Sequence, residues 1–246
     1  MKRLLIALQF LTVLPFKIHT EIKNEDYARS LIYFPVVGLT IGSILSLVPL
    51  SCGFLPVPVV GVIVLILFAF ITGALHLDGF ADTCDGFYGS KPKEEILRIM
   101  RDTRIGAMGV VGVALLLLLK FSLIISIPRD ALWRSLVLMC CFSRWVQAAG
   151  CLLPYARDEG KAGLFIKYAR RKDIVIAGLF TALVSYALFS LKGIAILSSS
   201  LIPALLFIRY AKTRIGGMTG DTLGAVSEIA EVSTLFSILI LGSVWI

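Results

Sequence analysis

Long apolar runs separated by short charged stretches dominate the pattern of this chain. A run of roughly 18 or more apolar residues can cross a bilayer as a helix, which satisfies every backbone amide within its own segment. The sequence therefore predicts an all-α, polytopic helical membrane protein, with a single integral membrane domain over residues 1–246. About seven spans are expected: Leu31–Leu50, Pro56–Leu75, Met108–Ile127, Leu132–Leu153, Ile174–Leu191, Gly193–Ile208 and Leu223–Ile246.

Lysine and arginine are concentrated in alternate connections between these runs. Residues 17–30, 76–105, 154–173 and 209–222 together hold 17 of the 24 basic residues. Because basic loops are retained on the cytoplasmic side, these four connections are expected to face the cytoplasm, with the protein in the cell (inner or plasma) membrane. The C-terminus is then expected outside. Leu4–Phe16 is too short to cross and is predicted to be a re-entrant or interfacial helix.

Composition agrees with this pattern and narrows the function classes. The chain is 58% hydrophobic and 16% charged, against about 45–50% and about 25% in soluble domains. The net charge of +8 is explained by basic cytoplasmic loops, so no nucleic-acid partner is expected. The five cysteines show no CxxC spacing and are interpreted as packing residues. No secretory signal is expected, because no small-residue cleavage site follows the first apolar run.

Three aspartates after the second span form the most informative motif. Asp78, Asp82 and Asp85 are spaced i, i+4 and i+7, which on a helix places them within about 60° of one another. Hard cations such as Mg²⁺ take oxygen ligands from carboxylates, waters and phosphates. The stripe therefore predicts a magnesium site. Acids near a bilayer are costly, which favours function over a solvated loop with this spacing by chance.

A second acidic group begins the last apolar run. Asp221 and Glu228 are seven residues apart and share a helix face with the small Gly224, which would allow another helix or a ligand to approach closely. Asp221 is a candidate fourth metal ligand, or alternatively a helix cap. Glu228 and Glu231 are either functional or simply paired with basic residues in other apolar runs, Lys120 and Arg144.

Arginines follow the aspartate stripe. Guanidinium groups bind phosphate bidentately, and a glycine turn leading into a helix offers free amides to the same anion. Arg101 and Arg104 are the candidates, whereas Arg98 fits an ordinary ion-pair ladder with Glu94 and Asp102. His76 falls on the opposite helical face from the aspartates, so it is as much a candidate helix-end or packing residue as a candidate base.

These motifs resemble the signature blocks of the cobalamin synthase family, whose members are adenosylcobinamide-GDP ribazoletransferases. The likeness runs nearly from end to end of the chain. The blocks are Leu8–Thr12 with Leu14-Pro15, His76–Asp82, Met100–Ala107 and Gly217–Asp221.

The resemblance implies a Mg²⁺-dependent transferase at the final assembly stage of adenosylcobalamin. A hydroxyl of α-ribazole, or of its 5′-phosphate, would attack the phosphorus attached to cobinamide, and GMP would leave. The expected partners are adenosylcobinamide-GDP, the acceptor and the lipid bilayer. A homo-oligomer is an alternative to a monomer. The implied catalytic residues are Asp82, Asp85 and Arg104; the implied substrate contacts are Arg101, Arg104, Thr219, Gly220 and His76; the implied magnesium ligands are Asp78, Asp82, Asp85 and Asp221.

Two other classes of function compete with this interpretation. CDP-alcohol phosphatidyltransferases and prenyltransferases are also intramembrane, aspartate-dependent enzymes, but the acidic spacing here fits theirs poorly. An ion-coupled transporter would use Lys120, Arg144, Glu228 and Glu231 as a relay near the midplane of the membrane. The position of the densest acids beside arginines favours phosphoryl transfer.

Overall fold

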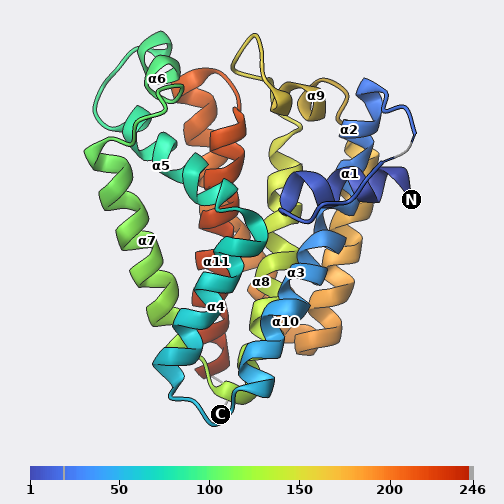
Figure 1. Ribbon diagram of the computed structural model, residues 1–246, viewed down its shortest axis with the longest axis vertical. Coiled ribbons are helices and arrows are strands. Elements are labelled where there is room, and N and C mark those ends of the chain that lie inside the picture. The colour runs from blue at the N-terminus through green and yellow to red at the C-terminus, as the bar shows by residue number, and fades with distance from the viewer. Residues whose placement is uncertain (19, 244–246) are drawn as a thin grey trace.

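The computed structural model describes residues 1–18 and 20–243, and the regular secondary structure within these residues is helical, apart from one isolated bridge between Tyr155 and Met218. The bounds of the helices are α1 (Lys2–Leu11), α2 (Asn24–Ser30), η1 (Leu31–Tyr33), α3 (Phe34–Ser51), α4 (Val57–Thr72), α5 (Leu75–Phe87), α6 (Lys93–Ile99), α7 (Ala107–Ser126), α8 (Arg129–Gly150), α9 (Lys161–Lys167), α10 (Arg171–Ile215) and α11 (Gly220–Ser243). Figure 1 shows a bundle of long helices with the short helices α2, α6 and α9 gathered at one end.

The all-α fold predicted from the apolar runs is confirmed. In the described part of the chain, four segments are long and apolar enough to cross a membrane, and the bent pair α4 and α5 makes a fifth if it counts as one span. The four segments are Asn24–Ser51, Ala107–Ser126, Arg171–Ile215 and Gly220–Leu241. The expected count of about seven stays a prediction, and the last three residues of the span predicted to end at Ile246 lie outside the described residues.

The central contact of the bundle joins α3 to α8. Gly38 and Gly42 lie one turn apart on α3, and a Cβ added to either would come within 2.3–2.6 Å of the α8 backbone, at Cys140 and Val137 respectively. Small residues at this spacing let helix backbones approach closely, which is the usual basis of packing between membrane helices. α8 was predicted as a span; it is not among the four apolar segments because it also carries charged side chains, Arg144 included.

α10 is a helical hairpin and accounts for two of the predicted spans. Ser190 has a left-handed φ of 53°, which breaks the helix there, and Gly193 packs directly against the backbone of Ser185. At one end Asp173 pairs with Arg29 of α2, and at the other Arg214 donates to the carbonyl oxygen of Gly89, just after α5. Both ends therefore lie at the same end of the bundle. The helix continues to Ile215, so the predicted loop over residues 209–222 begins only at Gly216.

α1 is shorter than the predicted helix Leu4–Phe16, because it ends at Leu11. Its apolar face is buried, with Ile6, Ala7 and Leu11 in the core, and Phe10 stacks on Phe34 of α3 with ring centroids 5.9 Å apart. α1 therefore packs onto the bundle as an amphipathic segment that is too short to cross. Cys140, Cys141 and Cys151 are buried, as expected of packing residues, whereas Cys52 and Cys84 are only partly buried.

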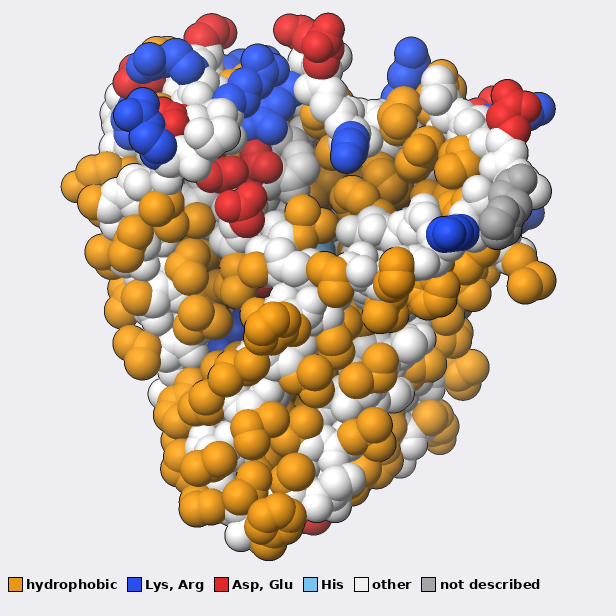
Figure 2. All heavy atoms as spheres, viewed as in Figure 1, with side chains coloured by type: hydrophobic (Ala, Val, Ile, Leu, Met, Phe, Trp, Pro, Cys, Tyr) orange, Lys and Arg blue, Asp and Glu red, His pale blue; other side chains and the backbone are white. Residues whose placement is uncertain are grey.

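Charged side chains gather at the end of the molecule where α2, α6 and α9 lie, and apolar side chains cover its flanks (Figure 2). That distribution is expected for a bundle with its sides in lipid and one polar face in water. We call this face the charged end. The aspartate stripe and the arginines lie here.

Candidate active site at the charged end

The helix that carries the three aspartates starts at a sharp bend. α4 and α5 meet at 91° across Gly73 and Ala74, which both have left-handed φ values, 60° and 54°. Glycine adopts this conformation readily, and the single alanine beside it completes the turn. α5 thus leaves the direction of α4 and runs obliquely at the charged end (Figure 1). The predicted helix through the aspartate motif is confirmed, and it lies outside the four long spans.

α5 crosses the start of α11 with almost no space between the backbones. A Cβ added to Gly79 would lie 2.9 Å from the Cα of Asp221, and one added to Gly224 would lie 3.3 Å from the Cα of His76. This confirms the expectation that Gly224 allows close approach of another helix. The crossing brings Asp221 beside the α5 aspartates, although more than 130 residues separate them along the chain.

Asp78, Asp82 and Asp221 form what we call the acid cluster. Asp78 is exposed, whereas Asp82 and Asp221 are half-buried. Burial, together with the neighbouring carboxylates of Asp221 and Asp78, raises the pKa of Asp82 to about 7. Negative charge at Asp82 is therefore disfavoured in the protein alone. A cation or a basic ligand placed here would relieve that repulsion.

Asp85, the third member of the predicted stripe, faces the start of α7. Its two carboxylate oxygens accept hydrogen bonds from the backbone N–H groups of Gly106 and Gly109, both at 2.8 Å. The first amides of a helix have no partner within the helix, and a carboxylate beside them also interacts favourably with the helix dipole. Asp85 therefore caps α7 from a different helix and ties α5 to α7.

This capping role predicts different effects on stability for two neighbouring aspartates. Asp85→Asn replaces one acceptor oxygen by an amide that cannot accept, so it should lower the free energy of unfolding by about 0.5–2 kcal/mol, the usual cost of losing a cap. Asp82→Asn should cause no such loss, because it removes charge from a repulsive cluster. Thermal unfolding of both variants in detergent makes the comparison. Equal stability for Asp85→Asn and wild type would mean that the cap contributes little.

Arg157 pairs with Asp221 and was not singled out in the sequence. Its guanidinium donates to a carboxylate oxygen of Asp221 at 2.7 Å and to the carbonyl oxygen of Met100 at 3.2 Å. Arg157 is one of six basic residues in the connection 154–173, and nothing in the local pattern separates it from the other five. Its role depends on the contact between this loop and the start of α11.

Several arginines line a cavity of about 390 Å³ next to this ion pair. The cavity lies between α6 and the loop after α8, and its basic lining residues are Lys93, Arg98, Arg101 and Arg157. Arg101, a phosphate contact predicted from the sequence, lines this cavity, and so does Arg98. Arg104 is different: its side chain is 90% exposed and pairs with Asp102. The Arg104 contacts also lower the pKa of Asp102.

The remaining predicted substrate contacts are His76, Thr219 and Gly220, and the first two are buried, although Thr219 also interacts with the Asp221 carboxylate. His76 is buried, and one of its ring nitrogens lies 3.2 Å from the side-chain oxygen of Gln147 on α8. Thr219 is also buried, and its hydroxyl accepts the backbone N–H of Thr222 at 3.1 Å, as an N-cap residue does. Gly220 is half-buried at the start of α11. Of these three residues, Gly220 is the one that a ligand at the acid cluster could approach directly.

A second charged cluster is buried deeper in the bundle. Lys120 of α7 bonds to both Glu228 and Glu231 of α11, and Arg144 of α8 pairs with Glu231 at 2.8 Å. All four side chains are at most 4% exposed, and Phe68 presents its ring to both cations. The expectation that these glutamates pair with Lys120 or Arg144 is confirmed. The four charges cancel.

The donor chemistry of the acid cluster fits Mg²⁺. In the part of the chain that the structure describes, no three histidine, cysteine, aspartate or glutamate side chains are arranged as a finished metal cage. Mg²⁺ is usually held by one or two carboxylates, with waters and substrate phosphates as the other ligands. The half-buried Asp82 and Asp221 provide oxygen donors of that kind, close to arginines that suit the phosphates of a substrate.

Fold and site together define the class of protein: a helical membrane protein whose acids and arginines lie around cavities at its charged end. The family model for cobalamin-5-phosphate synthase matches residues 3–239. Three relatives named adenosylcobinamide-GDP ribazoletransferase are similar over almost their whole length. They come from Geotalea daltonii (35% identical, 96% of each chain), Acetivibrio thermocellus (35%, 97% of each) and Alkaliphilus oremlandii (36%, 99% of each). No solved structure matches the chain.

The chain belongs to the cobalamin-5-phosphate synthase family. The family resemblance stated from the sequence motifs is therefore confirmed, and with it the assignment to the transferases of cobalamin biosynthesis.

Proposed function

We propose that this protein transfers the cobinamide phosphate of adenosylcobinamide-GDP to α-ribazole or its 5′-phosphate, with release of GMP, at the cytoplasmic face of the cell membrane. The observation that carries the proposal is the meeting of Asp82, Asp221 and Arg157 beside a basic cavity at the charged end. The names of the relatives support the choice of donor substrate.

The reaction forms one phosphorus–oxygen bond and breaks another. The acceptor hydroxyl attacks the phosphorus attached to cobinamide, the bond from that phosphorus to the bridging oxygen breaks, and GMP leaves with the bond electrons. The hydroxyl proton passes to a carboxylate of the acid cluster. Most of the catalysis in such a transfer comes from positioning the reactants and stabilising charge on the phosphates.

Asp82 and Asp221 would hold Mg²⁺, which would supply positive charge to the diphosphate, whereas the exposed Asp78, predicted from the sequence as a ligand, would add negative charge beside them. Asp221 also keeps Arg157 directed at the site through their 2.7 Å ion pair. Asp85 was predicted from the sequence as a ligand and a catalytic group. We propose that it acts by positioning, because its two oxygens already accept amides of α7.

The arginines of the basic cavity would bind the phosphates of the donor. Arg101 and Arg157 line the cavity itself, whereas the exposed Arg104 would close on the diphosphate only when the substrate is bound. A guanidinium can give two parallel hydrogen bonds to one phosphate, which fixes orientation as well as affinity. In this proposal the donor phosphates bind between α6 and the loop after α8, next to the ion pair of Arg157 and Asp221.

Arg101→Ala is expected to weaken donor binding without an equal effect on the acceptor. A hydrogen bond to a charged group is worth about 1.5–3 kcal/mol, so the Kd for adenosylcobinamide-GDP should rise roughly 10- to 150-fold. Binding of donor and acceptor is measured separately in detergent. Lys161→Ala, at an exposed position at the start of α9, is the matched control. Equal losses for both substrates would argue for a structural role of Arg101.

Release of GMP by purified protein in detergent tests the proposal against a transporter. A transferase should form GMP from adenosylcobinamide-GDP only when acceptor and a divalent cation are both present. A transporter would form none in detergent, and would instead move substrate across liposome membranes in response to an ion gradient. The paired, charge-neutral state of the buried cluster of Lys120, Arg144, Glu228 and Glu231 supports the transferase, because a relay needs groups that are free to change partners.

A further inference from the structure

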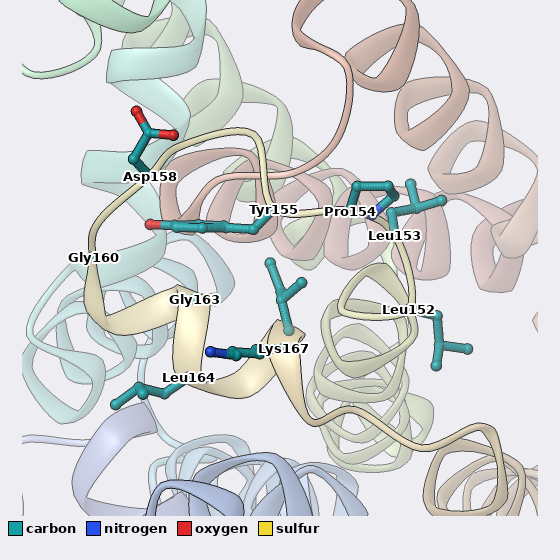
Figure 3. A pocket seen from close by; sticks show the side chains of 10 residues that line it. Leu152, Leu153, Pro154, Tyr155, Asp158, Gly160, Gly163, Leu164 and Lys167 are labelled. Atoms are coloured by element: carbon teal, nitrogen blue, oxygen red, sulfur yellow. The ribbon is translucent and has the colours of Figure 1, made fainter.

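A second cavity, of about 540 Å³, lies at the charged end between the end of α8, the loop that follows it, and α9. Figure 3 shows the Tyr155 ring above α9, with Gly163 and Lys167 beneath it in the view and Leu152, Leu153 and Pro154 to its right. Most of the lining is apolar, and this volume falls within the usual range for small-ligand pockets, about 300–1,000 Å³. The basic cavity of about 390 Å³ lies along the same loop, because Asp158 lines both cavities.

The wall of this cavity is fixed to the acid cluster through the backbone. The amide of Met218 donates to the carbonyl oxygen of Pro154, and the amide of Ala156 donates to the carbonyl oxygen of Met218, both at 2.9 Å. Gly217 makes the contact possible, since a Cβ there would lie 2.1 Å from the carbonyl oxygen of Pro154. Residues 154–156, which include Tyr155, are therefore hydrogen-bonded to the turn just before Asp221.

The Tyr155 ring is held in place before any ligand binds. Its hydroxyl donates to the carbonyl oxygen of Glu159 at 3.1 Å. Its edge lies against α9, where a Cβ on Gly163 would be only 3.0 Å from a ring carbon. An aromatic surface fixed in this way can stack on a flat ligand at little further cost in conformational entropy.

We propose that this cavity binds the aromatic base of the acceptor nucleoside, an inference that rests on the proposed function. The transfer needs a second substrate next to the acid cluster, and α-ribazole has a flat, largely apolar benzimidazole base, which matches a lining of leucines, proline and one aromatic ring. From this cavity the ribose would extend along residues 154–156 towards Asp221. Arg157 follows two residues after Tyr155 and donates to Asp221, so the loop leads from the aromatic ring to the acid cluster. The competing occupant is the guanine of the donor, whose polar edge could contact the two charged lining residues, Asp158 and Lys167, so the effect of substitutions on the donor KM separates the two bases.

Two substitutions of Tyr155 test the assignment. Tyr155→Ala removes the ring, and stacking of a base on an aromatic side chain is typically worth about 1–3 kcal/mol, so the KM for the acceptor should rise about 5- to 150-fold. The KM for adenosylcobinamide-GDP should stay near the wild-type value. Tyr155→Phe keeps the ring and loses only the bond to Glu159, so its acceptor KM should stay close to wild type.

A second pair of variants tests the same assignment of the cavity if Tyr155→Ala fails to fold. Leu164→Trp grows a half-buried lining residue into the cavity and should also raise the acceptor KM. Leu191→Trp makes the same change in a cavity at the opposite end of the bundle, where Leu191 is 78% exposed, and should have no effect. An unchanged acceptor KM in a folded Tyr155→Ala or Leu164→Trp protein would overturn the proposal. A rise confined to the donor KM would also overturn it and would place guanine here.

Equilibrium dialysis with α-ribazole alone separates this inference from the proposed function. Wild-type protein should bind α-ribazole without donor, and Tyr155→Ala should bind it more weakly by the same factor as its rise in KM. If wild-type protein bound α-ribazole in this way but formed no GMP, the proposed function would fail while the base site stood. Wild-type protein that forms GMP, with equal α-ribazole binding by Tyr155→Ala, would contradict the base site alone.

Discussion

Asp82→Asn is expected to lower GMP formation by about 100-fold or more, because mutating even the outer-shell partners of a metal site typically costs 10–100-fold and Asp82 is proposed as a direct ligand. Asparagine keeps the shape of the side chain and one acceptor oxygen. It lacks the charge that attracts a divalent cation, so added Mg²⁺ should restore only a small part of the activity. GMP formation is measured against Mg²⁺ concentration, with thermal unfolding followed in the same preparations.

The expected effect on folding separates loss of a ligand from loss of structure. Asp82 lies next to the carboxylates of Asp78 and Asp221, which help to raise its pKa, so removing its charge should leave the stability of the metal-free protein unchanged or slightly higher. Glu25→Gln is the matched control, since Glu25 is an exposed acid in the first turn of α2 at the same end. Near-normal turnover in folded Asp82→Asn protein would contradict the magnesium assignment.

Arg144→Met is expected to give the largest loss of stability, about 3–5 kcal/mol, as is typical when one partner of a buried ion pair is removed. Arg144 is 0% exposed and pairs with Glu231, which is also fully buried. Without Arg144, one positive charge on Lys120 faces two glutamates inside the bundle. The free energy of unfolding in detergent measures the loss, and α7, α8 and α11 should loosen together because the cluster joins them.

A double variant shows whether uncompensated charge is the cause. Arg144→Met combined with Glu231→Gln leaves the neutral pair of Lys120 and Glu228, so it should recover a large part of the lost stability. Replacing a buried pair as a unit is often nearly neutral, whereas breaking it is costly. If the double variant were as unstable as Arg144→Met alone, the loss would come from packing of the long side chain and not from charge.

The periodic features of this protein could be predicted from its sequence. Apolar runs located the long helices, because the requirement to satisfy backbone amides in lipid leaves few alternatives. The i, i+4, i+7 spacing placed Asp78, Asp82 and Asp85 on one helix, and Gly224 predicted a close helix crossing, which the contact with His76 confirms. These properties depend on neighbours within about two helical turns, which the sequence displays directly.

Contacts between distant segments could not be predicted in the same way. The spacing grouped Asp85 with the other aspartates, yet its carboxylate accepts hydrogen bonds from the α7 amides. The 91° bend before α5 determines which neighbouring helix each face of α5 contacts. Arg157 is one basic residue among several in its loop until the backbone bonds to Met218 bring it to Asp221. The hairpin at Ser190 was visible only as a gap between two apolar runs, since serine has no special preference for left-handed φ.

The fate of a single phosphorus atom shows which phosphorus of the diphosphate the acceptor attacks. Adenosylcobinamide-GDP labelled at the phosphorus attached to cobinamide is incubated with purified protein, α-ribazole and Mg²⁺, and the products are separated. If the acceptor hydroxyl attacks that phosphorus, the label will appear in the joined corrinoid product and the released GMP will be unlabelled. Label in the released nucleotide, or no transfer in protein that binds both substrates, would contradict the proposed transfer of the cobinamide phosphate to the acceptor.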